Sequence, residues 1–209
     1  MQIAILGTGP VGRALGKAIS AAGHDVVIGT RDPEQAQQRE EWAGLDLPLA
    51  AYHDLDGDVF INATNGQGSL AALRAVGDAL KGKVVIDTSN ALDFSHGFPP
   101  SLFVSNTDSL AEQLQRELPE VRLVKMFNTM ANEVMVDPNG LPSDTTIFVA
   151  GNDVTARQTA ASLAADLGWT DVLDLGDLTA ARGLEMYLPL WVRMFAQIGR
   201  AEFNIKVVR

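Results

Sequence analysis

Residues 2–12 read QIAILGTGPVG, an apolar strand that runs directly into a glycine-rich turn and the start of a helix. In this arrangement the first glycine permits a tight turn, the second lets the backbone approach a diphosphate, and the third lets helix and strand pack closely. The amides at the start of the helix would face that diphosphate. We therefore predict that a dinucleotide binds along Gly7, Thr8, Gly9, Pro10, Val11 and Gly12. Pro10 has no amide hydrogen, so Val11 is the leading phosphate donor.

The rest of the chain alternates short apolar runs with runs of helical period. Strands are expected at 2–6, 25–29, 58–63, 83–87, 121–127 and 145–150, and helices at 11–22, 33–43, 67–80, 107–117 and 153–167. Most of the strand runs are apolar on both faces, which is typical of parallel strands covered by helices on each side. The alternation predicts an α/β fold in which residues 1–175 form a doubly wound (Rossmann) parallel sheet. Expected helix caps are Asp32 and either Asn106 or Thr107.

Residues 176–209 are expected to add a short C-terminal helical extension. Apolar side chains recur at helical period from Leu184 to Ile198, but the opposite face is apolar too. A helix of this kind must be buried against its own sheet, a partner subunit or a cofactor ring. Pro189 should kink the helix or mark its restart. The tail then returns as an extended segment (199–209) near the strand ends.

Composition narrows the classes of partner. The chain has 209 residues, and its 16 Lys and Arg against 26 Asp and Glu give a net charge of −10. Without a basic block, this balance argues against nucleic acid and anionic membrane surfaces. The absence of cysteine removes disulfides, thiolate chemistry and thiolate metal sites. No secretory leader or long apolar run is visible, so we expect a cytoplasmic protein.

The second strand, in the stretch DVVIGTRDP (25–33), bears on which dinucleotide binds. A unit specific for NAD usually carries an acidic residue about 20 residues after the glycine turn, and Asp32 stands at that distance. The strand, however, ends at Gly29 and directs Thr30 and Arg31 towards the ribose. A hydroxyl and a guanidinium suit a 2′-phosphate, so we predict NADP(H). The alternative is that Asp32 caps the next helix while Arg31 only points into solvent.

Three further strand ends carry small polar side chains. They are Ala63-Thr64-Asn65, Asp87-Thr88-Ser89-Asn90 and Phe127-Asn128-Thr129-Met130. Since parallel strands end at one edge of a sheet, these groups should meet there and hold a ribose, a carboxamide and a second planar ring. Asn and Thr also favour turns at strand ends for local reasons. Lys125 and Asp87 are interpreted as structural groups.

No acid, base or nucleophile motif stands out. The three histidines are scattered without the spacing of metal ligands, and no serine nucleophile motif is present. We therefore predict no catalytic side chain and no metal site. His96 lies in the longest irregular segment (90–106), a candidate lid, and its role is left open.

The chain resembles the coenzyme F420-dependent NADP oxidoreductases. The resemblance rests on IAILGTGPVG, GHDVVIGTRDP, IDTSNALDF, VKMFNTM and the terminal FNIKVVR, and it covers nearly the whole chain. It implies an oxidoreductase that transfers a hydride between NADPH and a deazaflavin (F420) or flavin-like acceptor. A homodimer through the apolar C-terminal tail is expected from the tail itself. Thr8 to Gly12 would meet the diphosphate, and Thr30 and Arg31 the 2′-phosphate. The resemblance implies that Ala63, Thr64, Asn65, Asn128, Thr129 and Met130 also contact the cofactors, and the strand-end position of Asn90 adds this residue to the predicted contacts.

Two other classes of function remain open from the residues alone. One is a short dehydrogenase of the hydroxyacid or imine class, which also begins with a glycine turn but usually adds a long helical domain. The other is a non-catalytic NADP-binding redox sensor, because hydride transfer needs no diagnostic side chain.

Overall fold

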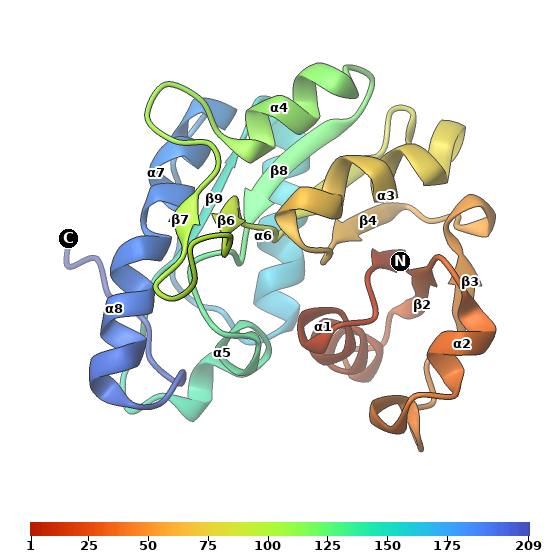
Figure 1. Cartoon of the computed structure of the whole chain (residues 1–209), viewed down its shortest axis with the longest axis horizontal. Coiled ribbons are helices and arrows are strands. Elements are labelled where there is room, and N and C mark those ends of the chain that lie inside the picture. Colours follow the sequence, from red (N-terminus) through yellow and green to blue (C-terminus); the bar gives the residue numbers. More distant parts are fainter.

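An eight-stranded sheet forms the centre of the computed structural model, which describes residues 1–209 (Figure 1). Its strand order is β10-β9-β8-β5-β4-β1-β2-β3. The strands are β1 (Gln2–Leu6), β2 (Asp25–Thr30), β3 (Leu49–Ala51), β4 (Val59–Asn62), β5 (Val84–Asp87), β8 (Arg122–Met126), β9 (Ile147–Gly151) and β10 (Val172–Asp174). The chain leaves β1 on one side for β2 and β3 and returns on the other side as β4. This reversal at β1 is the point where doubly wound folds bind their ligands.

Helices cover both faces of the sheet because the strands are apolar on both faces. Ile3 and Ile5 of β1 point to one face, together with α1 (Pro10–Ala21), α5 (Asn132–Val136) and α6 (Val154–Asp166). Ala4 and Leu6 point to the other face, with α3 (Ser69–Val76), α4 (Leu110–Glu117) and α7 (Ala181–Met186). These four strand residues are fully buried. The two apolar cores confirm the predicted Rossmann architecture.

Several elements differ from the sequence-based expectation. β9 runs antiparallel to β8, so the sheet is mostly rather than wholly parallel. Strands β3 and β10 were missed because they contain only three residues each. The segment expected to be irregular contains a small hairpin of β6 (Leu92–Asp93) and β7 (Ser101–Leu102). The helix expected at 33–43 is only α2 (Pro33–Gln37) followed by a 3-10 turn at 40–42.

The ends of three helices show how local chemistry sets their bounds. Asp32 caps α2 as predicted, since its Oδ1 accepts from the Gln35 amide at 2.9 Å. The cap of α4, however, is Ser109 rather than Asn106 or Thr107, and its Oγ accepts from the Glu112 amide at 3.1 Å. Pro189 marks a restart, because α8 (Leu188–Ile198) begins directly after α7 with this proline in its first turn. A first-turn proline costs no helical hydrogen bond.

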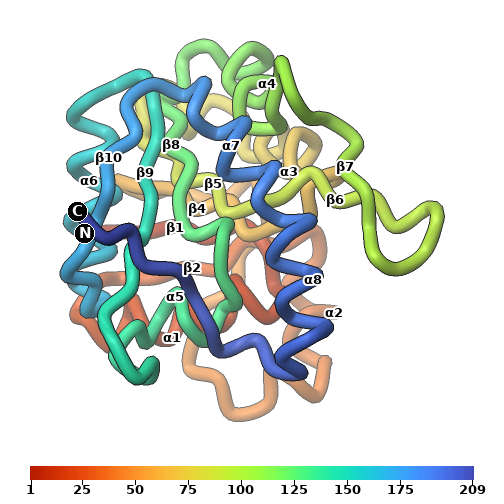
Figure 2. The backbone as a smooth tube through the Cα atoms, turned by 90° about the vertical axis from the view of Figure 1, so that its left-hand side faces the viewer, coloured from red at the N-terminus to blue at the C-terminus, as the bar shows by residue number.

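The last residues run back from α8 towards the far edge of the sheet (Figure 2). The Thr146 amide donates to the Ile205 carbonyl at 2.9 Å, beside the start of β9. Asp171 binds Lys206 and Arg209, each at 2.6 Å. Because β9 runs antiparallel, its start lies at the carboxyl end of β8, where this extended segment was expected. The β6–β7 hairpin projects from the body of the molecule (Figure 2).

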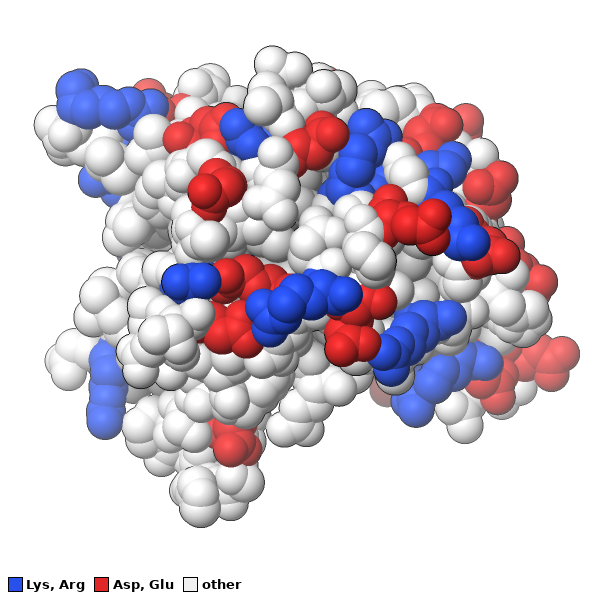
Figure 3. All heavy atoms as spheres, turned by 90° about the horizontal axis from the view of Figure 1, so that it is seen from above, with Lys and Arg blue, Asp and Glu red and all other residues white.

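Acidic and basic side chains alternate on the face that α3 and α4 form (Figure 3). Several of them pair with one another, such as Arg116 with Asp108 and Arg182 with Glu112. This face therefore offers no single-sign patch to a polyanion. No helix in the structure combines the length and apolarity that crossing a bilayer requires.

Candidate functional site

The glycine turn between β1 and α1 uses its three glycines for two purposes. Gly7 has a φ of 119°, and a Cβ added there would meet the Ala63 carbonyl oxygen at 2.6 Å. A Cβ at Gly12 would lie 2.0 Å from the Gly7 oxygen, so both glycines fix the turn itself. A Cβ at Gly9, by contrast, would meet nothing within 4 Å. Gly9 therefore keeps the outer surface of the turn flat and open.

The amides of this turn are free to bind an anion. Those of Thr8, Gly9, Val11 and Gly12 donate to no acceptor in the chain. They surround the N-terminus of α1, a helix of 12 residues whose dipole favours negative charge at this end. Together with the open surface at Gly9, these donors fit a dinucleotide diphosphate.

The tip of β2 places a buried hydroxyl next to an exposed cation. Thr30 is 6% exposed, and Arg31 follows it at the surface. Gly29 leaves room for the buried Leu55 side chain, because a Cβ there would lie 2.4 Å from Leu55 Cδ1. Arg31 and Tyr52 line a cavity of about 250 Å³ that extends to Thr64 and Asn65. Burial raises the pKa of the Tyr52 phenol, and the nearby Arg31 cation opposes this rise.

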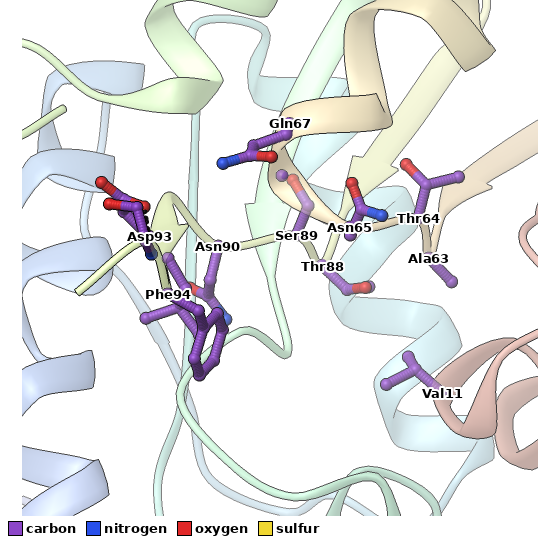
Figure 4. Close-up of a pocket in the computed structure, with 13 residues that line it drawn as sticks. Val11, Ala63, Thr64, Asn65, Gln67, Thr88, Ser89, Asn90, Asp93 and Phe94 are labelled. Carbon is purple, nitrogen blue, oxygen red and sulfur yellow. Dashed lines mark hydrogen bonds between the residues drawn. The ribbon is translucent and has the colours of Figure 1, made fainter. Parts of the chain in front are cut away.

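A larger pocket of about 670 Å³ opens at the carboxyl ends of β4 and β5, and we call it the strand-end pocket. Figure 4 shows Val11 at one end of the pocket and Asp93 and Phe94 at the other. Between them lie Ala63 to Gln67 and Thr88 to Asn90. The volume lies within the range of small-molecule sites, which is roughly 300–1,000 Å³. Thr64 and Asn65 line both this pocket and the cavity beside Arg31, so one extended ligand would reach both.

Hydrogen bonds fix the walls of the strand-end pocket. Asn62 at the end of β4 donates from Nδ2 to Asp87 Oδ1 at 2.7 Å and to Ser69 Oγ at 2.9 Å. Its Oδ1 accepts from Thr64 Oγ1 at 2.6 Å. Ser89 Oγ donates to Asp87 Oδ1 at 2.7 Å. The two polar wall segments are therefore joined underneath by side chains that are themselves buried.

A buried ion cluster lies under the second wall segment. Lys125 is fully buried, and its Nζ lies 2.7 Å from Asp87 Oδ2, 2.9 Å from Glu185 Oε1 and 2.5 Å from the Ser89 carbonyl oxygen. Glu185 also accepts from the Leu110 amide of α4 at 2.7 Å. Burial alone would lower the pKa of Lys125, but the Asp87 and Glu185 carboxylates outweigh it and raise that pKa. Lys125 and Asp87 are fully paired and inaccessible, so their role is structural.

The third predicted strand end lies behind the pocket rather than on its surface. Asn128 is 2% exposed and donates from Nδ2 to Asn90 Oδ1 at 2.9 Å and to the Leu184 carbonyl at 3.0 Å. Asn90 returns a bond to the Asn128 carbonyl at 3.0 Å. Thr129 and Met130 are likewise buried. Val11, Ala63, Thr64, Asn65 and Asn90 thus line the pocket, and Asn128 supports it through Asn90.

Other pocket residues were not anticipated from the sequence. Gln67, Asp93 and Phe94 line the strand-end pocket, and Tyr52 lines the smaller cavity. Phe94 is 59% exposed. Its role could not be predicted from the sequence, because it depends on the hairpin folding beside the pocket. Exposed His96 does not line it.

Comparisons with known proteins agree with this geometry. Residues 2–91 match the model of a family described as "NADP oxidoreductase coenzyme F420-dependent". The F420-dependent NADP reductase of Methanothermobacter marburgensis is 30% identical, over 93% of this chain and 92% of the relative. That of Methanocaldococcus jannaschii is 29% identical, over 92% and 91%.

A solved structure from Arthrobacter sp. FB24, proposed to be an F420-dependent NADP-reductase, is 47% identical to this chain. It superposes with a TM-score of 0.96 over the full length of both chains. The relatives above match over nearly their whole lengths as well, so the likeness includes the C-terminal extension as well as the glycine turn. The chain therefore belongs to the F420-dependent NADP oxidoreductase family and is an NADP-dependent oxidoreductase.

Proposed function

We propose that this protein transfers a hydride between NADP(H) and a deazaflavin of the F420 type bound in the strand-end pocket. The observation that carries the proposal is the pocket itself, about 670 Å³ of space between Val11 and Phe94 at the reversal point of the sheet. Its volume leaves room for a planar ring beside a nicotinamide. The exposed phenyl ring of Phe94 offers a face on which a flat acceptor can stack.

The cofactor contacts follow from this placement. We assign the diphosphate to the free amides of the glycine turn, Thr8 to Gly12, and the 2′-phosphate to Thr30 and Arg31. Ala63, Thr64, Asn65 and Asn90 would line the ribose and the nicotinamide. Asn128, Thr129 and Met130 would act from behind, by fixing Asn90 and the pocket floor.

The bound rings supply the redox chemistry, a hydride that leaves one ring and joins the other. The chain would hold the rings in contact, and the pocket would offer them no acidic side chain that donates a proton near neutral pH. Asp93 is the single ionisable side chain among the residues that line the pocket. The Ser95 amide donates to Asp93 at 2.9 Å and lowers the pKa of this carboxyl. Asp93 is therefore charged near neutral pH, and any proton exchanged with the acceptor comes from solvent.

Anaerobic assays with NADPH and a single acceptor test the proposal. Purified protein is mixed with F420, flavin mononucleotide or ferric citrate, and the oxidation of NADPH and the reduction of the acceptor are both followed. We expect F420 to be reduced with the highest kcat/KM. If NADPH binds but F420 accepts no hydride, the acceptor assignment is wrong. If no acceptor is reduced at all, the redox sensor becomes the better description.

We also propose that residues 176–209 form an appended unit whose outer face joins two subunits into a homodimer. Leu190, Phe195 and Ile198 of α8 are exposed, as are Phe98 between β6 and β7 and Phe103 directly after β7. Large exposed apolar side chains on one helix are typical of an interaction site. Leu190→Asp should yield a monomer by light scattering, while Val154→Asp, at another exposed apolar position, should not. A monomeric parent protein would contradict the proposal.

A further inference from the structure

A second arginine approaches the proposed 2′-phosphate region from outside the expected motif. Arg39 lies between α2 and the 3-10 turn at 40–42, and its Nη1 donates to Thr8 Oγ1 at 3.0 Å. The Arg39 amide donates to the Ala36 carbonyl, and the Arg39 carbonyl accepts from the Trp42 amide. Ala36 and Trp42 are both fully buried. The arginine is thus anchored on both sides, and its side chain crosses to the glycine turn.

The positive charge of Arg39 is not paired with a carboxylate of the protein. The arginines with a carboxylate within 4.0 Å are Arg13, Arg74, Arg116, Arg157, Arg182 and Arg209. Five arginines are not among them, and two of the five, Arg31 and Arg39, lie on the single segment between β2 and β3. The one partner of the Arg39 side chain is the neutral Thr8 hydroxyl, which engages one of five guanidinium donors. In a chain of net charge −10, two unpaired arginines on one segment are poised for an anionic ligand.

The register of the sheet places the attachment points of these two arginines, Thr8 and Thr30, at adjacent strand ends. β1 and β2 are parallel neighbours with Leu6 opposite Gly29, and the Gly7 amide donates to the Gly29 carbonyl at 3.0 Å. Thr30 is the last residue of β2 and Thr8 stands two residues after β1, so both lie at neighbouring strand ends, and neighbouring strands lie roughly 5 Å apart in a sheet. Arg39 is fixed at Thr8, and Arg31 follows Thr30. In a doubly wound fold, the adenosine ribose lies between these two strand ends.

We propose that Arg39 is the second cation of the 2′-phosphate site and determines, with Arg31, the preference for NADP(H) over NAD(H). The inference rests on the proposed cofactor contacts and adds a residue to them. It also explains how a site with Asp32 beside Arg31 can hold a phosphate. The Asp32 carboxylate is directed to the Gln35 amide as a helix cap, while Arg39 supplies positive charge from its position beside Thr8.

Binding of 2′,5′-ADP, NADPH and NADH to the full-length protein, measured by calorimetry, tests the role of Arg39. A guanidinium bond to a phosphate is a strong charge-assisted bond, so Arg39→Ala should weaken 2′,5′-ADP and NADPH binding about tenfold. NADH binding should change less than about twofold, since it lacks the 2′-phosphate. Arg39→Lys keeps the charge and should retain most of the affinity for NADPH. Arg116→Ala, far from the glycine turn, is the matched control.

The possible outcomes separate this inference from the proposed function. Equal losses for NADPH and NADH would mean that Arg39 only holds Thr8 in place, and unchanged binding would deny it any role; either result overturns the inference. Both readouts are binding constants, so they hold whether or not F420 is reduced. Failure of the parent protein to reduce F420 would overturn the acceptor assignment and leave the Arg39 result intact.

Discussion

Charged side chains lie at the carboxyl ends of strands in two regions of this molecule, and the two regions hold them in opposite ways. Under the strand-end pocket, Lys125 is fully buried and paired with Asp87 and Glu185. Beside β2, Arg31 is exposed, and Arg39 is half-buried with only a hydroxyl partner. Buried ionised groups must be paired, since an unpaired charge in the interior is very costly. Groups that bind a charged ligand must instead remain unpaired and accessible.

The comparison assigns roles to the charges of these two regions. The charges whose bonds are all made within the protein maintain the pocket, and we propose that the charges with free donors recognise the cofactor. This division assigns Lys125 to structure although it stands at the edge of the sheet where ligands bind. It assigns Arg39 to recognition although it lies 31 residues from Thr8 in the sequence.

The largest effect is expected from Lys125→Met, which removes the cation from the buried cluster. Asp87 and Glu185 would then face each other without a counter-charge. Breaking a buried ion pair in this way typically costs about 3–5 kcal/mol of stability. Because the pKa of Lys125 is raised above its usual 10.5, the cluster stabilises the fold below that pH and weakens as the pH rises through the raised pKa. Urea unfolding at neutral pH measures the loss.

Lys81→Met is the matched control for this experiment. Lys81 is paired with Asp78 at 3.1 Å, but its side chain is 56% exposed. An exposed ion pair contributes about 0–1 kcal/mol, so this variant should unfold nearly as the parent does. If the two lysine variants lose equal stability, burial does not set the stabilising contribution of a paired lysine in this protein.

A smaller effect, divided between stability and binding, is expected from the glycine turn. Gly12→Ala places a methyl group against the Gly7 oxygen and should cost about 1–3 kcal/mol of stability, as overpacking does. Gly9→Ala meets no protein atom and should leave the melting temperature unchanged while weakening NADPH binding. Thermal melts and NADPH titrations of both variants separate the two roles. Loss of stability in Gly9→Ala would show that all three glycines serve the turn.

Arg31→Ala tests the exposed side of the comparison. The loss of one charge-assisted bond at an exposed position should weaken NADPH binding about tenfold and NADH binding far less. Stability should be unchanged, because Arg31 has no carboxylate partner in the protein. Fluorescence titration of parent and variant with both nucleotides gives the ratio of the NADPH and NADH dissociation constants. Equal losses for NADPH and NADH would remove Arg31 from the 2′-phosphate site.

Much of the fold was predictable because its strands carry a strong local signal. β1, β4, β5 and β8 are apolar on both faces. The glycine turn and the Asp32 cap have local sequence patterns that indicate their structure. The direction of β9 was not predictable, since an apolar run reads the same in both orientations. The three-residue strands β3 and β10 are too short to show a period.

The candidate site was predictable only where its residues stand in motifs. Thr30, Asn65 and Asn90 follow strand ends, which one can read along the chain. Arg39 and Glu185 act across long sequence separations, 31 residues to Thr8 and 75 residues to Leu110. Such contacts depend on how helices dock, and no local pattern encodes them. Neither residue belongs to a motif, so neither was a candidate.

The smallest effect is expected from Asp108→Asn, which breaks a partly exposed ion pair. Arg116 donates two bonds to Asp108, at 3.0 and 2.7 Å, and these lower the pKa of the Asp108 carboxyl to about 2. A lowered pKa adds stability at pH values above the usual 3.8, and this stability is lost as the pH falls towards 2.

The arginine in this pair is 58% exposed, so solvent screens the interaction and the expected loss in Asp108→Asn is at most about 1 kcal/mol. Urea unfolding of parent and variant at several pH values between neutral and acidic conditions should show a small gap that closes at low pH. Arg116→Gln should reproduce it, because it breaks the same pair. A gap as large as that of Lys125→Met would mean that pairing, rather than burial, sets the stabilising contribution of a charge in this region.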